Sequence, residues 1–222
     1  MIKLVIVDFD DTLCLTEDAT YLMESRIGIE MGMPLMDREI HKETFGKPIE
    51  EIISIRIPGI DVSEFMRRLE IAIPEYIDKG ILDNVSDKNL KTLLNIKSKG
   101  KIIGMLTGRN LFELKHLIAK ENPLSDIFSL SQYKDNSKYQ KPDPRVFDIF
   151  FSTFNVKPQE TIYIGDSIND GVASNGAGIH FLASLESKNR NEDDFKDINV
   201  EYFVNKFTEL EEIINKLDQV EH

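Results

Sequence analysis

Three short apolar runs, each followed at once by polar residues, dominate the pattern of this chain. They cover Lys3 to Val7, Ile102 to Leu106 and Thr161 to Ile164. Runs of this length, rich in β-branched residues and bounded by turn signals, favour buried strands. Helical periods lie between the later runs, and alternation of strands with helices predicts a mostly parallel sheet covered by helices. The pattern therefore predicts an α/β fold with a Rossmann-like three-layer core.

The first two runs lie too far apart for a single crossover. Roughly 100 residues separate them, many more than one connecting helix needs. We expect helices from Thr16 to Gly32, around 50–53 with a stop at Pro58, and from Ser63 with a break at Pro74. We therefore predict a Rossmann-like core of residues 1–13 and 85–222 and an inserted α-helical cap domain of residues 14–84. The alternative is a set of surface helices packed on the sheet.

The rest of the core can be outlined from caps and apolar periods. Ser86 is a suitable N-cap for a helix that ends by Gly100. Asp143 and Pro144 would start another helix. We further expect a helix over 111–118, strands over 127–130 and 179–183, a loop over 188–197 and a final helix over 207–217.

Two carboxylates follow the first run, and their position suggests chemistry. Asp8 and Asp10 would leave the same side of the strand if extended geometry persists that far. Open α/β sheets bind ligands outside the carboxyl ends of their strands. Carboxylates so close repel each other unless a cation or a proton lies between them. An acidic turn after an edge strand is the alternative interpretation.

Polar residues also follow the other two runs. Thr107, Gly108 and Arg109 come after the second, and a Gly165-Asp166-Ser167-Ile168-Asn169-Asp170 segment ends the third. Lys141 stands between them in a Lys-Pro-Asp-Pro segment. One shared site explains these groups more economically than separate surface turns. Each has an alternative: a helix cap for Thr107, a surface position for Lys141, capping carboxylates for Asp166 and Asp170, and a salt bridge or surface position for Arg109.

The order of these segments resembles the motifs of the haloacid dehalogenase-like hydrolase superfamily. They are DxDxT, a strand ending in Thr, Lys-Pro-x-Pro and GDSxxD. The match runs from Lys3 to about Leu182 and favours the phosphatase branch with a cap after the first motif, which includes phosphoglycolate phosphatase and β-phosphoglucomutase relatives. The resemblance implies that Asp8 is the nucleophile and Asp10 the general acid/base. It further implies the remaining site residues: Asp8, Asp10, Asp166 and Asp170 for magnesium, and Thr107, Gly108, Arg109 and Lys141 for the phosphoryl group.

The resemblance implies a magnesium-dependent phosphatase that hydrolyses a small phosphorylated metabolite through an aspartyl-phosphate. Asp10 matches the phosphatases and phosphomutases of the family. In β-phosphoglucomutase relatives a lysine precedes the cap-loop glycine and an arginine follows three residues later, whereas Gly46 here is flanked by Phe45 and Ile49. Lys47 is a candidate substrate contact, with solvent exposure as its alternative. A phosphomutase and a phospho-accepting signalling protein are the competing functions.

Charge and composition narrow the partners. The net charge is −12, without a basic stripe, so we expect no nucleic-acid partner. No apolar stretch of about 18 residues occurs, so we expect no membrane partner. Cys14 is the single cysteine, which fits a packed thiol in a reducing cytoplasm, and the chain begins directly with the first run, so we expect no signal peptide. We expect a monomer or a homodimer.

Overall fold

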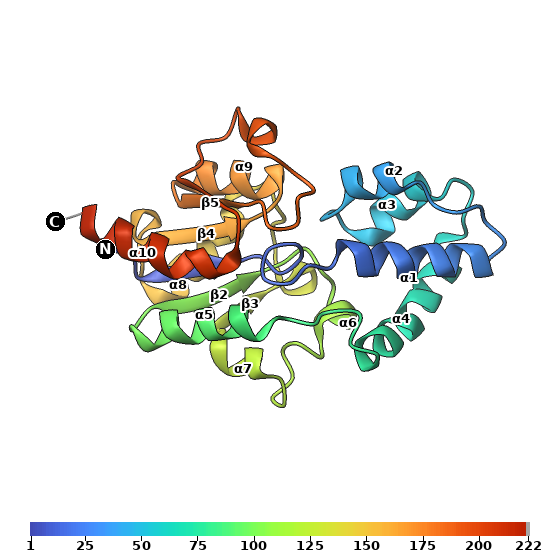
Figure 1. Cartoon of the computed structure of the whole chain (residues 1–222), viewed down its shortest axis with the longest axis horizontal. Coiled ribbons are helices and arrows are strands. Elements are labelled where there is room, and N and C mark those ends of the chain that lie inside the picture. Colours follow the sequence, from blue (N-terminus) through green and yellow to red (C-terminus); the bar gives the residue numbers. More distant parts are fainter. Residues whose placement is uncertain (221–222) are drawn as a thin grey trace. The chain divides into compact units, whose positions relative to one another are not determined.

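The computed structural model describes residues 1–220, so the last two residues of the predicted core lie outside the described part. The chain divides into two compact units (Figure 1). The core unit consists of Met1–Leu13 and the chain from Val85 onward, and the inserted unit is Cys14–Asn84. Cys14 is buried, as expected for a packed thiol. Within residues 1–220, no helix has both the length and the apolar character needed to span a membrane.

A parallel sheet organises the core unit. Within the described residues it has six strands in the order β3-β2-β1-β4-β5-β6. Their bounds are Leu4–Val7 (β1), Ile102–Leu106 (β2), Leu130–Gln132 (β3), Thr161–Gly165 (β4), His180–Ser184 (β5) and Tyr202–Val204 (β6). Every neighbouring pair is parallel, and Val7 of β1 lies in register with Met105 of β2 and Ile164 of β4. The carboxyl ends of these three strands therefore meet at one edge.

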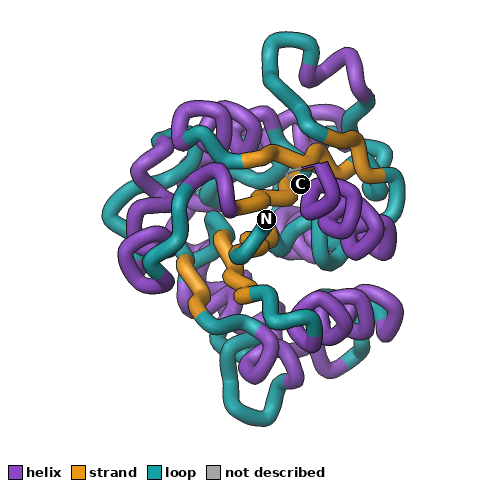
Figure 2. The backbone as a smooth tube through the Cα atoms, turned by 90° about the vertical axis from the view of Figure 1, so that its left-hand side faces the viewer, coloured by secondary structure: helices purple, strands orange, loops and turns teal. Residues whose placement is uncertain are grey.

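Helices cover both faces of the sheet (Figure 2). They are α5 (Asp87–Ser98), α6 (Leu111–Leu114), α7 (Pro123–Ile127), α8 (Asp148–Phe154), α9 (Ile168–Ala177) and α10 (Leu210–Val220). Short 3₁₀ turns lie at η1 (Lys134–Asn136), η2 (Pro144–Phe147), η3 (Pro158–Glu160), η4 (Glu192–Phe195) and η5 (Phe207–Glu209). Helix α9 packs on β4, β5 and η2, whereas α5 packs on β2, α7 and α10. These layers confirm the predicted Rossmann-like α/β fold.

The structure corrects several element bounds in the core. The helix expected over 111–118 stops at Leu114, and turns follow it. The strand expected over 127–130 lies at 130–132, because Asn122 and Pro123 start a short helix that includes Ile127. The loop expected over 188–197 contains η4, and β6 was not expected because its three residues form too short an apolar run.

Four helices form the inserted unit: α1 (Glu17–Glu30), α2 (Arg38–Thr44), α3 (Ile49–Arg56) and α4 (Val62–Asp78). Helix α2 was not expected. Helix α4 begins after Asp61, whose carboxylate accepts the Glu64 N–H at 3.1 Å, and not at Ser63. The break predicted at Pro74 is wrong. Proline removes one N–H donor, but the helix continues because its apolar face, which includes Phe65 and Leu69, is buried.

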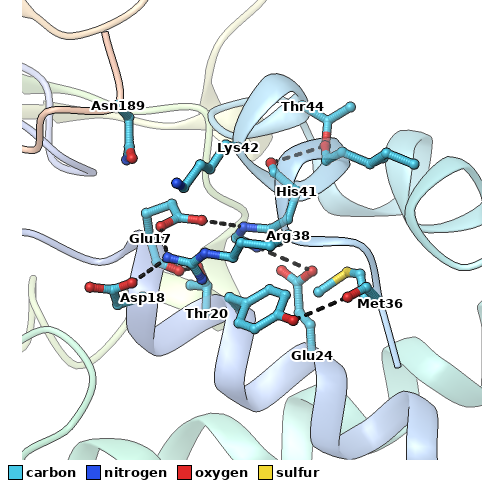
Figure 3. Close-up of polar contacts among 12 residues, drawn as sticks. Glu17, Asp18, Thr20, Glu24, Met36, Arg38, His41, Lys42, Thr44 and Asn189 are labelled. Atoms are coloured by element: carbon cyan, nitrogen blue, oxygen red, sulfur yellow. Dashed lines mark hydrogen bonds and ion pairs between the residues drawn. The ribbon is translucent and has the colours of Figure 1, made fainter. Parts of the chain in front are cut away.

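A buried ionic network joins α1 and α2 (Figure 3) and extends to α3 through Arg56. His41 is fully buried, with Nδ1 2.6 Å from a Glu17 oxygen and Nε2 3.6 Å from a Glu24 oxygen. Arg56 Nη1 donates to both Glu24 oxygens at 2.9 and 2.7 Å, and Arg38 pairs with Glu17. Burial opposes the charged imidazole, but the hydrogen bond to Glu17 and the nearby Glu24 carboxylate outweigh it and raise the pKa of His41 above its ordinary value.

Candidate active site

Polar side chains gather where the central strands of the core unit end. Asp8 follows β1, Thr107 follows β2 and Asp166 follows β4, and these strands are neighbours in the sheet. Lys141 comes from the loop between η1 and η2, and Asp170 lies in the first turn of α9. Residues far apart in the sequence thus reach the edge at which parallel sheets bind ligands.

Lys141 is the cationic centre of this edge. Its ammonium lies 2.8 Å from Asp8 Oδ2, 2.7 Å from Asp170 Oδ1 and 3.0 Å from the Tyr163 hydroxyl oxygen. Its side chain is 11 % exposed, so the surface-lysine alternative is wrong. Two buried carboxylates raise the pKa of Lys141 above its ordinary value although burial opposes this, so the side chain is charged.

Asp170 is fixed by its helix and by a close approach to β4. Ser167 caps α9, and its N–H and hydroxyl donate to Asp170 Oδ2 at 2.8 and 2.7 Å. The Tyr163 hydroxyl donates to Asp170 Oδ1 at 2.8 Å. A Cβ on Gly165 would come within 2.5 Å of Asp170 Cγ, so the glycine makes room for the carboxylate. Asp170 is therefore the first-turn carboxylate of a capping box with Ser167, as the alternative held, and it also contacts Lys141.

The site contains more negative charge than Lys141 neutralises. Asp8, Asp166 and Asp170 are all buried, and one oxygen of each lies within 4.8 Å of the others. Burial, aided by the Asp170 charge, raises the pKa of Asp8 to about 7 although Lys141 opposes the shift. Burial and Asp170 also raise the pKa of Asp166 well above its usual range. Asp170 shows the opposite direction: burial would raise its pKa, but Lys141 and Ser167 lower it.

This donor set fits a hard divalent cation. Carboxylate oxygens in a compact cluster are the ligands that magnesium takes, and two of the three carboxylates are destabilised as anions in the protein alone. A cation between them would remove the repulsion that raises these pKa values. The Asp10 carboxylate does not belong to the cluster, so Asp10 could contribute to magnesium binding only through its backbone carbonyl.

Asp10 instead pairs with Arg109. Arg109 Nη2 lies 2.6 Å from Asp10 Oδ1, and Nε lies 2.9 Å from Oδ2. Arg109 is 8 % exposed, so its alternative as a surface residue is wrong, whereas the salt-bridge alternative describes what is observed. Asp8 and Asp10 thus have different cationic partners.

The other predicted site residues have definite places. Thr107 is buried, and its hydroxyl oxygen accepts the Arg109 N–H at 3.3 Å. Asn110, and not Thr107, precedes α6, so the helix-cap alternative for Thr107 is wrong. Gly108 is half-buried, and Lys47 is exposed on the inserted unit. The roles of these residues toward a ligand remain predictions.

Two buried residues near the cluster escaped sequence analysis. Tyr163 lies inside β4, where an aromatic residue looks like ordinary core, yet its hydroxyl joins Lys141 to Asp170. Asp11 has φ of 51° and accepts a hydrogen bond from Asn189 Nδ2 at 2.7 Å. Its place in the acidic run of the first motif was a signal, because aspartate tolerates the left-handed region better than most residues.

Several known proteins are similar to this chain in sequence or in fold. The chain is 28 % identical over 180 residues to a glyceraldehyde 3-phosphate phosphatase of Pyrococcus furiosus, covering 75 % of this chain and 73 % of that protein. It is 26 % identical over 222 residues to a phosphoglycolate phosphatase of Nitrosospira multiformis, covering 97 % and 96 %. The crystal structure of CbbY from Rhodobacter sphaeroides in complex with phosphate superposes with a TM-score of 0.79 at 19 % identity, covering 95 % and 96 %.

The family match covers most of the chain. The profile described as haloacid dehalogenase-like hydrolase matches residues 5–184, which include every motif that contributes to the site in the core unit. The protein therefore belongs to the haloacid dehalogenase-like hydrolase family.

Proposed function

We propose that this protein is a magnesium-dependent phosphatase that hydrolyses a small phosphorylated metabolite through an aspartyl-phosphate on Asp8. The observation that carries the proposal is the buried cluster of Asp8, Asp166 and Asp170 around Lys141 at the carboxyl edge of the sheet. Phosphoryl transfer requires mainly a positioned nucleophile and neutralisation of charge. Asp8 offers the nucleophile, and Lys141 together with a divalent cation held by the cluster would neutralise the charge. Family membership and the phosphatases among its relatives support the same reaction.

Asp8 is oriented for attack. Its Oδ1 accepts the Phe9 N–H at 2.7 Å and its Oδ2 contacts Lys141 at 2.8 Å, so both oxygens have fixed directions. Attack of a carboxylate oxygen on phosphorus forms the acyl-phosphate bond as the bond to the leaving oxygen breaks. Lys141, the Thr107 hydroxyl and the Gly108 N–H would hold phosphoryl oxygens, which matches their predicted role.

Asp10 would carry the proton in both halves of the reaction. In the first half its carboxylic acid donates a proton to the leaving alcohol oxygen. In the second half its carboxylate takes a proton from the water that attacks phosphorus, and inorganic phosphate leaves Asp8. A magnesium ion held by Asp8, Asp166 and the Asp10 backbone carbonyl, with Asp170 in support, would supply the positive charge that a dianionic substrate needs.

The inserted unit would act as a cap that selects the substrate. Exposed Lys47 lies in the turn between α2 and α3 and would contact the part of the substrate beyond the phosphoryl group. Phosphoglycolate, a triose phosphate or a sugar phosphate are the candidates that the named activities of the relatives support. Phe45 and Ile49 around Gly46 lack the charges that flank this glycine in the mutase relatives, so hydrolysis is favoured over a phosphomutase.

A phosphate-release screen tests the proposal. Purified protein is assayed with p-nitrophenyl phosphate and a panel of phosphorylated metabolites, in magnesium and in EDTA, beside Asp8→Asn. We expect magnesium-dependent release that EDTA abolishes, inhibition by calcium because of its looser coordination, and loss of several orders of magnitude in Asp8→Asn. Full activity in EDTA would refute the metal dependence. More than about a tenth of the wild-type rate in Asp8→Asn would refute the nucleophile.

A further inference from the structure

The Arg109–Asp10 pair has a specific geometry. Nε and Nη2 of Arg109 lie 2.9 and 2.6 Å from the two different oxygens of Asp10. This is a side-on, two-point contact in which a planar guanidinium fixes the plane of a carboxylate. The Asp10 side chain is 19 % exposed and that of Arg109 9 %, so the pair is largely removed from solvent.

Arg109 is held in place by contacts other than Asp10. Its guanidinium carbon lies 4.7 Å from the centroid of the Phe9 ring, and Nη1 donates to the Glu113 carbonyl oxygen at 3.3 Å. Its backbone N–H donates to the Thr107 hydroxyl oxygen at 3.3 Å. The guanidinium is therefore a fixed support against which the Asp10 carboxylate rests.

All three guanidinium nitrogens of Arg109 donate hydrogen bonds within the protein. Two of the guanidinium nitrogens are occupied by Asp10 and the third by Glu113. Each Asp10 oxygen faces one guanidinium nitrogen, and a carboxylate oxygen has two lone pairs. The contact thus directs the carboxylate without blocking proton transfer, and it ties the turn after β1 to the turn after β2.

We propose that Arg109 is a positioning residue that orients Asp10 for proton transfer, and not a ligand of the phosphoryl group as the sequence motif suggested. This inference rests on the proposed function. In the step affected, the Asp10 O–H bond breaks and the proton goes to the leaving oxygen while its bond to phosphorus breaks. A misdirected Asp10 therefore impairs most those substrates whose leaving oxygen needs the proton.

Leaving-group dependence separates the two roles. We would measure kcat/KM, which reports the steps through departure of the leaving group, with p-nitrophenyl phosphate and with n-propyl phosphate. The variants are Arg109→Gln, Arg109→Lys, Asp10→Asn and the double variant Asp10→Asn/Arg109→Gln. Nitrophenolate is a good leaving group and departs without a proton, whereas the alkoxide of n-propyl phosphate needs a proton from Asp10 to leave. General acid catalysis contributes about 10²–10⁴-fold to the rate.

We expect Asp10→Asn to lose much more on the alkyl than on the aryl substrate. Arg109→Gln should follow the same pattern, with a loss on the alkyl substrate about 10-fold or more beyond its loss on the aryl substrate. Arg109→Lys keeps the charge but not the two-point contact, so it should resemble Arg109→Gln. The double variant should be no slower on the alkyl substrate than Asp10→Asn, because both changes remove one function.

Retained aryl activity shows that each variant is folded. Equal losses on both substrates, or a double variant that multiplies the two single losses, would place Arg109 on the phosphoryl group and overturn the inference. An unchanged Arg109→Gln would also overturn it, by showing that the pair is not needed for catalysis. Failure of the wild type on both substrates, and on the metabolite panel, would instead refute the proposed function.

Discussion

Asp8→Asn should stabilise the metal-free protein increasingly as the pH rises. Asp8 is 6 % exposed, and its pKa is raised from 3.8 to about 7, chiefly by burial and by the Asp170 charge. A raised carboxyl pKa means that the folded protein binds the proton more tightly than the unfolded chain. The unfavourable charge is therefore absent below about pH 4, grows between about pH 4 and pH 7, and is constant above that range.

The magnitude follows from the same shift. One pKa unit corresponds to about 1.4 kcal/mol, so ionised Asp8 would lower the free energy of unfolding by at most about 4 kcal/mol. Asparagine has nearly the same size, can accept the Phe9 N–H, and leaves Lys141 its contact with Asp170. The contacts that the Asp8→Asn substitution removes change the free energy of unfolding by an amount that does not depend on pH. Between pH 5 and pH 8 the advantage of asparagine should grow by about 2–3 kcal/mol.

Urea unfolding in EDTA at constant ionic strength measures this difference at pH 5, 6, 7 and 8. Asp143→Asn is the matched control, because the pKa of Asp143 is about 2 and its carboxylate does not titrate in this range. Saturating magnesium should stabilise the wild type more than Asp8→Asn, since a bound cation favours the ionised carboxylate. If the free energies of unfolding of the wild type and of Asp8→Asn changed in parallel with pH, burial would not destabilise the ionised Asp8 carboxylate and the reasoning would be refuted.

Two further predictions concern lysines and the inserted unit. Lys141→Ala should lower kcat/KM equally on every substrate of the metabolite panel, because it removes a charge that stabilises all the transition states. Lys47→Ala should instead change the order in which the substrates are preferred. Equal losses on all substrates from Lys47→Ala would place Lys47 in the phosphate site. In magnesium, the free energy of unfolding of the wild type should fall as the pH rises above about 6.5 toward 9. The pKa of His41 is raised in the folded protein, so its charge stabilises the fold at low pH and this stabilisation is lost as the imidazole deprotonates. The His41→Gln variant should lack this fall. A wild-type curve that is flat between pH 7 and pH 9 would contradict the second.

The fold was predictable because its strands carry a simple signal. β1, β2 and β4 are short, apolar and followed by polar residues, so both their existence and the polarity of their carboxyl ends could be inferred. Shorter elements were harder. β6 has three residues, and α2 depends on an Asp37 cap whose carboxylate accepts two backbone N–H groups. Local pattern alone does not separate such segments from loops, since tertiary contacts decide them.

The Pro74 error has a different physical source. Proline was expected to break the helix because it lacks an N–H donor. The loss of one backbone hydrogen bond does not end α4, whose residues Phe65, Leu69 and Tyr76 are buried along one face. Burial of several large side chains contributes more free energy than one hydrogen bond. A proline near the end of a strongly amphipathic helix is therefore weaker punctuation than its local chemistry suggests.

The sequence predicted that Asp8, Lys141, Asp166 and Asp170 would lie together, but it did not predict which charged groups would pair. Motif spacing brought Asp8, Asp10 and Lys141 to one edge, yet nothing in the spacing indicated which cation would face which carboxylate. In the structure, Asp8 pairs with Lys141 and Asp10 pairs with Arg109. The role of Tyr163 could not be predicted either, because an aromatic residue inside a strand looks like an ordinary core residue and the sequence does not show that its hydroxyl contacts Lys141.

This pairing of partners explains how two carboxylates only two residues apart can do different chemistry. Asp8 lies in a crowded anionic cluster, where Lys141 is shared with Asp170 and the remaining charge favours a divalent cation. Asp10 lies outside that cluster, in a two-point contact with the Arg109 guanidinium. A nucleophile must remain ionised beside a phosphate, whereas an acid/base must exchange its proton with the leaving oxygen and with water. Because the two carboxylates have different cationic partners, substitutions at Lys141 and at Arg109 should impair different functions in the same step: charge stabilisation for Lys141 and proton transfer for Arg109.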